Sequence, residues 1–298
     1  MSYDLFFCTE IDKSVTKEAI SEYLVHLPYI TNEWNYNNPH TGVYFSFLHS
    51  PPSSENEIET VIPSGYSDSN LSFSINYLRP KFFAEEAMPY VEQLCNTFGF
   101  LIIDPQDHIV GGNNSPKKAK ADNLIESWTQ NNKVALSVYR QQRTLPPYLS
   151  RETSLEWWKH QSHVERIQNV LGDSIYVPNI LLFADTDNNK VITAVAWTEA
   201  IPFIFPKCDI VIIVRHEQKG LFRRDPKLAV KGWIEAAEVK DKISRYMQNI
   251  ETEIGLLPAL LPEKSPKVKG LFVRLKTNPM PEKYIRIAPD SMVDEEVS

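Results

Sequence analysis

Two histidines beside a pair of tryptophans are the side chains of this sequence best suited to chemistry. His160 and His163 lie three residues apart, and Glu156 stands about one helical turn before His160. On a helix the two imidazoles would share a face, where they can bind a transition metal or act as general acid and base. The pattern is not H-E-x-x-H, and His160 also falls in an apolar stripe (Trp157, Val164, Ile167, Leu171). The favoured interpretation is therefore histidines that flank the core, with no metal. Glu156, His160 and His163 are kept as the catalytic candidates of an alternative.

Two further polar motifs lack the spacing of a ligand site. Asp185-Thr-Asp-Asn-Asn is similar to the opening of a calcium loop, but Lys190 replaces the required glycine and Ala196 the bidentate glutamate. The Gly111–Lys118 segment does not have the P-loop spacing, and Pro116 removes a backbone donor. We therefore predict turns at both places and no cofactor.

Aromatic and acidic residues near the N-terminus fit a protein interface. Aromatic rings bury a large area with few rotatable bonds, which suits interface anchors and core positions equally. Acidic loop residues steer a basic partner and raise its rate of association. The binding candidates are Trp34, Tyr36, Tyr44, Tyr66, Glu55, Glu57 and Glu59.

Residues 1–110 are predicted to form the domain that positions these candidates. The hydrophobic pattern gives the order strand, helix, strand, strand, helix, strand, which is typical of a ferredoxin-like βαββαβ domain. Residues 71–77 alternate most regularly, which predicts one buried face and one face that is wet or meets a partner. Thr16 is placed to cap the first helix, and Pro89 should kink the second. Another α+β order of these elements stays open.

Residues 111–298 are predicted to form a helical connector and a second α+β unit with a mainly antiparallel sheet. The boundary is expected at Gly111–Pro116. Thr153 and Glu156 form a capping box for a helix that ends near Gly172. Residues 134–138 fit either helix or strand. A long helix is expected after Pro226, with an apolar stripe from Trp233 to Ile254, and strands are expected at 176–184, 191–197, 210–214, 271–275 and 284–287.

Composition is typical of a soluble globular protein. The chain has 298 residues, 42% hydrophobic and 23% charged, which favours two domains. We expect no signal peptide and no membrane span, because no apolar stretch approaches the ~20 residues that a span needs. Three widely spaced cysteines (Cys8, Cys95, Cys208) favour a reducing compartment, so the expected location is the cytoplasm.

The net charge of −7 disfavours binding to nucleic acid or to an anionic membrane. The charge is uneven, since the stretch from Lys264 to Lys276 is basic without an intervening acid. Two interpretations of this stretch stay open: the solvated face of a strand, or a contact with an acidic partner.

Several runs resemble a family of uncharacterised bacterial cytosolic proteins. The runs are Tyr3–Phe7, Thr41–Phe47, Phe73–Tyr77 with Arg79-Pro80, Trp157-Trp158 and Ala196–Asp209. This resemblance covers much of the chain but implies no activity and no catalytic residues. In their acidity and their lack of a visible active site, proteins of this kind are similar to immunity proteins that neutralise secreted toxins.

We therefore expect a cytoplasmic protein that binds a partner protein, such as a cognate toxin, and blocks it by occlusion. Two alternatives remain. One is an enzyme with a dispersed site between the domains that uses His160 or His163. The other is a sensor that binds a small molecule between the domains. The oligomeric state is left open.

Overall fold

The computed structural model describes residues 1–50, 62–107, 115–142, 146–216 and 227–295. Helices make up 36% and strands 33% of it, so the predicted α+β class is confirmed. The chain divides into two compact units. Unit 1 comprises residues 1–145 and 289–294, and unit 2 comprises residues 146–288 and 295–298.

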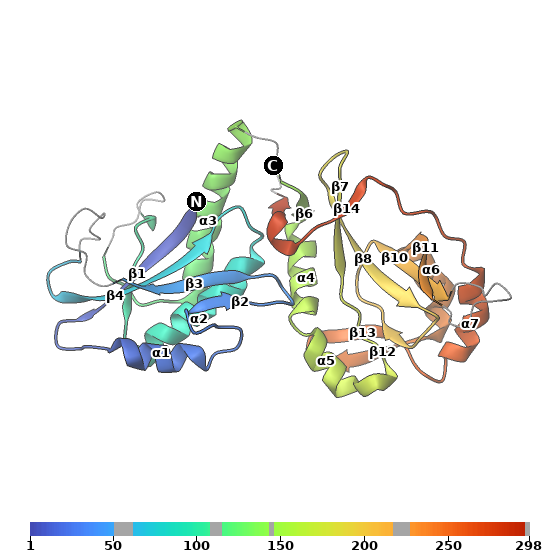
Figure 1. The fold of residues 1–298 in the computed structure, drawn as a ribbon, viewed down its shortest axis with the longest axis horizontal. Helices are drawn as coiled ribbons and strands as arrows, with labels where there is room; N and C mark the ends of the chain where they lie inside the picture. Colours follow the sequence, from blue (N-terminus) through green and yellow to red (C-terminus); the bar gives the residue numbers. More distant parts are fainter. Residues whose placement is uncertain (51–61, 108–114, 143–145, 217–226, 296–298) are drawn as a thin grey trace. The chain divides into compact units, whose positions relative to one another are not determined.

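Unit 1 is built on an antiparallel sheet of five strands in the order β2-β3-β4-β1-β5 (Figure 1). The strands are β1 (Ser2–Glu10), β2 (Asn35–Asn37), β3 (Tyr44–His49), β4 (Tyr66–Asn76) and β5 (Leu101–Ile103). The helices are α1 (Lys17–Val25), α2 (Phe82–Phe98) and α3 (Ala121–Gln142), followed late in the chain by a 3₁₀ turn at Pro289–Ser291. As predicted, the Thr16 hydroxyl caps α1 by accepting from the Ala19 amide at 3.3 Å.

One face of this sheet is buried and the other is partly exposed. Residues of the buried face alternate along most of β1 and along parts of β3 and β4, as the pattern at 71–77 predicts; they are Tyr3, Leu5, Phe7, Phe45, Phe47, Leu71, Phe73 and Ile75. The helices contribute to this same core with Ile20 and Leu24 of α1, Val91 of α2 and Trp128 of α3. Most of the intervening strand residues are partly exposed on the other face.

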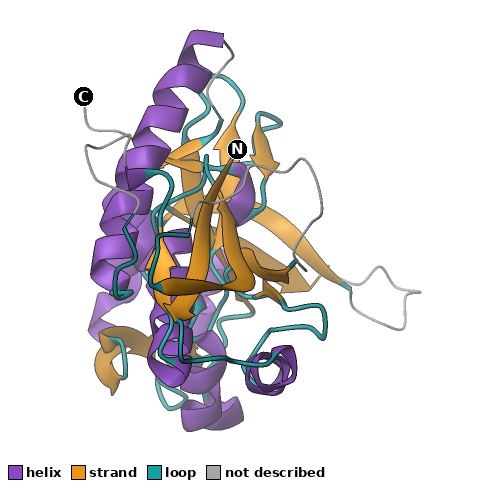
Figure 2. Ribbon diagram, turned by 90° about the vertical axis from the view of Figure 1, so that its left-hand side faces the viewer, coloured by secondary structure: helices purple, strands orange, loops and turns teal. Residues whose placement is uncertain are grey.

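Helix α3 belongs to unit 1, whereas the sequence analysis assigned residues 111–298 to a helical connector and a second α+β unit. It is a single helix of 22 residues, so the segment 134–138 is helical rather than extended (Figure 2). Its Trp128 ring stacks on Tyr77 at 6.3 Å between centroids, and α3 packs against α2. These contacts explain its place in unit 1.

Unit 2 contains a five-stranded and a three-stranded sheet. The larger has the order β11-β10-β8-β7-β14; β10 is parallel to β8, and the other neighbours are antiparallel. The smaller is antiparallel, in the order β12-β13-β9. The strands are β6 (Tyr148–Ser150), β7 (Leu181–Asp185), β8 (Val191–Thr198), β9 (Phe203–Ile204), β10 (Ile210–His216), β11 (Leu228–Glu235), β12 (Met247–Thr252), β13 (Gly255–Leu260) and β14 (Tyr284–Arg286); β15 (Val293–Glu295) spans the last unit boundary.

The helices of unit 2 are α4 (Arg151–Gln161), α5 (Val164–Leu171), α6 (Ala236–Ile243) and α7 (Ser265–Arg274), with 3₁₀ turns at Gly172–Ser174 and Ser244–Tyr246. The prediction of one helix from Thr153 to Gly172 is wrong: Ser150 caps α4, and the chain breaks at Ser162-His163 before α5. The expected first strand is shorter than predicted, since β7 begins only at Leu181.

Two other expectations for unit 2 are also wrong. The predicted long helix after Pro226 is instead β11, α6 and β12, since Gly232 has φ +133° and the backbone of Trp233 pairs with Asn278. The predicted strand at 271–275 lies mostly in helix α7, which has Pro266 in its first turn and buries Val268 and Phe272 one turn apart. The basic stretch from Lys264 to Lys276 is therefore mostly helical, since α7 spans Ser265–Arg274.

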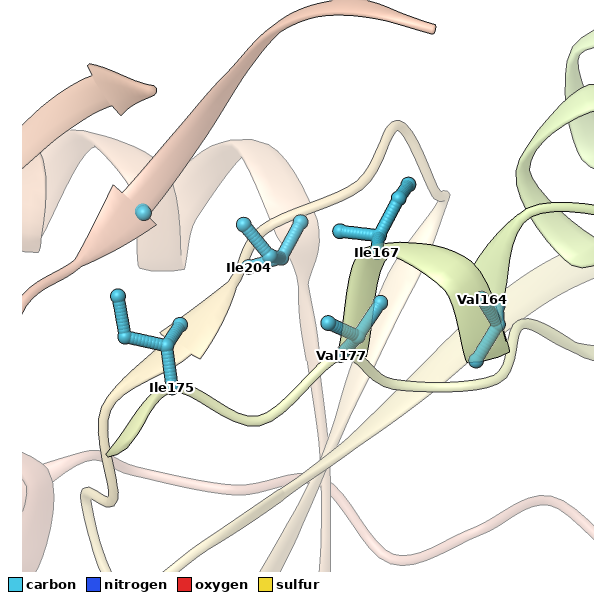
Figure 3. Packing of buried hydrophobic residues seen from close by; sticks show 6 residues of the cluster. Val164, Ile167, Ile175, Val177 and Ile204 are labelled. Atoms are coloured by element: carbon cyan, nitrogen blue, oxygen red, sulfur yellow. The ribbon is translucent and has the colours of Figure 1, made fainter. Parts of the chain in front are cut away.

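A compact aliphatic cluster joins α5 to the smaller sheet. Val164 and Ile167 of α5 meet Ile175, Val177 and Ile204, as Figure 3 shows. Ala259 of β13 completes the cluster, and Leu171, Ile250 and Ile254 pack against it while staying partly exposed. We call this set the α5 cluster.

Candidate binding face

The predicted histidine pair is split between two helices. His160 of α4 is buried, and its Nε2 donates to the Pro178 carbonyl at 2.8 Å. Burial lowers the pKa of His160 below its usual range. His163 lies in the break before α5, where Nδ1 is 2.8 Å from the Lys159 carbonyl. Glu156 instead faces Lys207 at 2.7 Å. Each group thus has its own partner, and the described ranges hold no cluster of metal-ligating side chains.

Two of the predicted aromatic anchors are core residues. Trp34 is 5% and Tyr36 2% exposed, and the Tyr36 ring stacks on Phe45 at 4.4 Å. The Tyr36 hydroxyl donates to Glu86 at 2.7 Å, and burial raises its pKa. As placed, these two rings fill the interior and do not present a surface. The acidic candidates Glu55, Glu57 and Glu59 lie outside the described residues.

Tyr44 and Tyr66 are partly exposed. Tyr66 begins β4 and pairs in register with Glu10. Tyr44 begins β3 at one end of the partly exposed sheet face, and its ring packs edge-on against Phe83 of α2 at 5.7 Å between centroids. We call this surface the serine face; it consists of Asp4, Tyr44, Ser46, Ser72, Ser74 and Asn76, all partly exposed.

The centre of the serine face is made of small hydroxyl side chains. Strand register places Ser74 between Ser46 of β3 and Asp4 of β1. Ser72 lies between Leu48 and Phe6 in the same way. The small serine side chains leave room for another chain to approach β4, between the larger side chains of Leu48 and Phe6.

A guanidinium group stands at the Tyr44 end of this face. Arg79 donates to the Tyr44 hydroxyl from Nη2 at 2.6 Å and from Nε at 3.2 Å, and its Nη1 donates to the Leu78 carbonyl at 2.9 Å. Asn76 donates to the same hydroxyl at 3.1 Å. Arg79 forms no ion pair within the part of the chain that the structure describes, and it retains N–H donors beyond these three.

The turn that carries Arg79 is held from helix α3. Asn132, which is buried, accepts from the Leu78 amide at 2.7 Å and donates to the Arg79 carbonyl at 3.0 Å. Leu78 has φ +59°, a left-handed conformation that costs energy for a branched residue and persists only where surrounding contacts fix it. The amide of Asn132 supplies such contacts.

This arrangement can bind an anionic group. A guanidinium matches a carboxylate in two parallel hydrogen bonds, and partial burial weakens competition from water. Tyr44, Asn76 and the serines add neutral donors and acceptors around it.

Sequence reasoning named Tyr44 but missed Arg79, Asn132 and the serines. The alternation at 71–77 already indicates a second face that is wet or meets a partner, and Ser72, Ser74 and Asn76 are its members. The role of Arg79 depends on contacts with residues 35 and 53 positions away, which no local pattern reports.

Comparisons with protein-family models, with curated proteins and with solved structures find no match to this chain. No helix in the described ranges combines the length and apolar character needed to cross a membrane.

Proposed function

We propose that this chain is a protein-binding protein that recognises its partner through the serine face of unit 1. The observation that carries the proposal is Arg79, a partly exposed guanidinium that has no acidic partner within the described residues and is fixed beside a shallow polar sheet face. In this proposal a carboxylate of the partner binds Arg79, and the partner's backbone or small side chains lie over Ser46, Ser72 and Ser74.

The fold of unit 1 supports this use of the sheet. We propose that it is a ferredoxin-like domain with β2 added at one edge. Without β2, the strands in chain order are β1, β3, β4 and β5, and they lie in the sheet as β3-β4-β1-β5 with every neighbour antiparallel. Such a scaffold carries its helices on one face and leaves the other for contacts.

The charge of the N-terminal part favours a partner with a basic surface. Residues 1–145 contain 17 Asp and Glu against 10 Lys and Arg. An acidic surface speeds the approach of a basic partner, while one carboxylate seated on Arg79 fixes its orientation. The acidic run with Glu55, Glu57 and Glu59 belongs to this same stretch of sequence.

The biological role that we propose is inhibition by occlusion, as an immunity protein inhibits its toxin. This part of the proposal rests on the sequence resemblance. The free cysteines, of which Cys8 and Cys95 are buried, support a reducing compartment such as the cytoplasm.

The test is affinity capture of the partner by the tagged full-length chain from lysate of the native bacterium. Ser74→Lys places a long charged side chain at the centre of the serine face, and Arg79→Gln removes the carboxylate partner. The matched controls are Ser137→Lys, on the exposed side of α3, and Arg286→Gln, on β14 of unit 2. Circular dichroism checks that all four variants fold.

We expect a stoichiometric partner with the wild-type chain and both controls, and its loss with Ser74→Lys and Arg79→Gln. The activity of the captured partner should fall when the wild-type chain is added. Failure to capture any partner contradicts the proposal, and so does equal capture by all four variants.

A further inference from the structure

Helix α7 of unit 2 presents a basic surface that the proposed function does not use (Figure 1). The stretch from Lys264 to Lys276 contains four lysines and one arginine and no acidic residue. Within α7, Lys267, Lys269 and Arg274 are exposed. We call these three side chains, together with Lys276, which is exposed just after the helix, the α7 basic surface.

The charge of this surface is not neutralised by the described part of the fold. Elsewhere in unit 2, Lys207 lies 2.7 Å from the carboxylate of Glu156. The α7 basic surface forms no ion pair of this kind within the ranges that the structure describes. Residues 146–288 contain 21 Lys and Arg against 17 Asp and Glu, the opposite balance to residues 1–145. An unpaired basic surface in a net basic part of the chain attracts an anion.

Helix α7 is held from the inside of unit 2, so a partner would not have to order it. The Phe272 ring is buried and meets Trp197 at 4.7 Å between centroids. At the first turn, the Ser265 hydroxyl donates to the Ala200 carbonyl at 2.7 Å. At the last turn, the Arg215 guanidinium donates to the Phe272 carbonyl at 2.5 Å. A surface that is already fixed loses little entropy when a partner binds.

The basic side chains lie on both flanks of the exposed face of α7. With 3.6 residues per turn, Lys267 and Arg274 lie two turns apart on one flank, about 10 Å along the helix axis. Lys269 and Val273, which is 65% exposed, lie one turn apart on the other flank. Gly270 lies between the flanks and adds no side chain. The helix is about 15 Å long, a length that an extended segment of about five residues covers.

An acidic protein segment fits this surface better than a membrane or a nucleic acid does. The apolar residues Val268 and Phe272 of α7 are buried, so the helix has no apolar face left to enter lipid. A long polyanion such as duplex DNA would also meet the other surfaces of a chain whose net charge is −7. A short acidic segment meets α7 alone, and one apolar side chain in it can contact Val273.

We propose that the α7 basic surface binds a short acidic segment of a partner protein. In this proposal, glutamate or aspartate side chains pair with Lys267, Lys269 and Arg274, and one apolar residue among them rests on Val273. The surface lies within unit 2 and does not depend on the serine face.

Two labelled peptides, titrated against the full-length chain by fluorescence anisotropy, test the chemistry of the segment. One has three glutamates on each side of a leucine, and the other is its glutamine counterpart. We expect the glutamate peptide to bind at about 0.01 M ionic strength, where the Debye length is about 30 Å, and to dissociate at about 1 M, where it is about 3 Å. The glutamine peptide should bind at neither ionic strength.

Two double variants locate the binding site. Lys267→Glu/Lys269→Glu reverses one charge on each flank of α7 and should weaken binding of the glutamate peptide about tenfold, within the range of two exposed ion pairs. The matched control, Lys159→Glu/Lys240→Glu, makes the same change of net charge at exposed lysines of α4 and α6. It should leave the affinity within about twofold of the wild-type value, since screening limits the effect of distant charges. Circular dichroism checks that both variants fold.

Four results would overturn the proposal. The glutamate peptide binds no better than the glutamine peptide, or the two double variants weaken its binding equally. The glutamate peptide does not bind, while duplex DNA or vesicles with phosphatidylserine do, which would assign the surface to another class of partner. Sedimentation shows a dimer at low salt that Lys267→Glu/Lys269→Glu disperses, which would assign it to a second copy of the chain.

Discussion

At the scale of single residues, a buried carboxylate organises one end of the core of unit 1. Asp104, 1% exposed, accepts from the Tyr3 hydroxyl at 2.5 Å, from Ser127 Oγ at 3.0 Å and from the Gln106 amide at 2.9 Å. The neighbouring Tyr77 hydroxyl is also buried but has no hydrogen-bond partner within the described ranges. Tyr3 and Tyr77 are in edge contact, at 6.2 Å between ring centroids. Within the described residues, the Tyr3 hydroxyl is hydrogen-bonded and the Tyr77 hydroxyl is not.

Replacing these tyrosines by phenylalanine should give opposite results. Tyr3→Phe removes a donor from a buried carboxylate, so we expect the free energy of unfolding to fall by about 1–3 kcal/mol. Tyr77→Phe removes a hydroxyl that bonds to no described group, so stability should change by less than about 0.5 kcal/mol or rise. Urea denaturation measures both. Equal losses would show that Tyr77 has a partner, such as an ordered water.

Gly232 is required at its position by conformation and by space. It has φ +133°, and a Cβ there would lie 2.2 Å from the Asn278 carbonyl oxygen and 2.9 Å from Thr277 Cβ. Gly255 has φ +113°, and a Cβ added to it would have nothing within 4 Å, which makes it a matched control. Comparing alanine substitutions at Gly232 and Gly255 therefore separates the cost of backbone strain from the cost of steric overlap.

We expect Gly255→Ala to cost about 1–3 kcal/mol, the strain of its backbone conformation. Gly232→Ala should cost clearly more, because the segment 277–278 must also move away from β11. The difference between the two urea midpoints is the measurement. If both variants lose the same stability, the contact of residues 277–278 with β11 contributes little.

At the scale of elements, helix α3 fixes the turn between β4 and α2. Asn132→Ala removes both hydrogen bonds that hold Leu78 and Arg79 in place. We expect a loss of about 1–3 kcal/mol in the free energy of unfolding and loss of partner capture, although Arg79 itself is intact. The control is Asn131→Ala, its buried neighbour, which within the described residues donates to the Ser127 carbonyl of its own helix and to no other group.

Asn131→Ala should keep partner capture, since it leaves the turn untouched. Capture by Asn132→Ala at the wild-type level would mean that Arg79 does not need the fixed turn. Denaturation curves of both variants show whether any loss of capture reflects unfolding of the whole unit.

Elements with a local signal were predictable from the sequence, and those fixed by distant contacts were not. The cap at Thr16 and the alternation at 71–77 are read from neighbouring residues. In contrast, the apolar residues between Trp233 and Ile254 fit a helical stripe, but pairing of β11 with β10 and of β12 with β13 divides them. The spacing of Leu271 and Val273 fits a strand as well as a helix, and the burial of Phe272 favours the helix α7.

At the scale of the whole molecule, the candidate sites are assembled from segments far apart in the sequence. The histidine pair was suggested by spacing alone, but the chain breaks at Ser162-His163 and separates it. Part of the serine face was predictable from the sequence, since its β4 residues Ser72, Ser74 and Asn76 alternate with apolar residues. The position of the Arg79 guanidinium is fixed only in the folded chain, where Tyr44 of β3 and Asn132 of α3 both contact residues 78–79.

The buried tyrosines make the stability of the molecule sensitive to alkaline pH. Burial raises the pKa of Tyr3, Tyr36, Tyr77 and Tyr90, all in unit 1, above the ordinary value. Burial also raises the pKa of the Cys95 thiol to about 12. In each case the folded state holds its proton at a pH where the unfolded state has released it. The stabilisation that each group gives the folded state is therefore complete below the pKa that the group has in the unfolded chain. It is lost as the pH rises above that pKa.

We expect the free energy of unfolding to decline from about pH 8.5, where unfolded thiols ionise, and more steeply above about pH 10, where unfolded phenols do. Each tyrosine that stays protonated in the fold adds up to about 1.4 kcal/mol per pH unit to this slope. The double variant Tyr36→Phe/Tyr90→Phe removes two of these groups and leaves the thiols and the other tyrosines, so its slope above about pH 10 should be shallower than that of the wild-type chain. Urea denaturation across this range, with phenolate absorbance followed in parallel, measures both slopes. Parallel slopes would mean that Tyr36 and Tyr90 ionise in the folded chain as readily as in the unfolded one, and phenolate would then appear before the loss of structure.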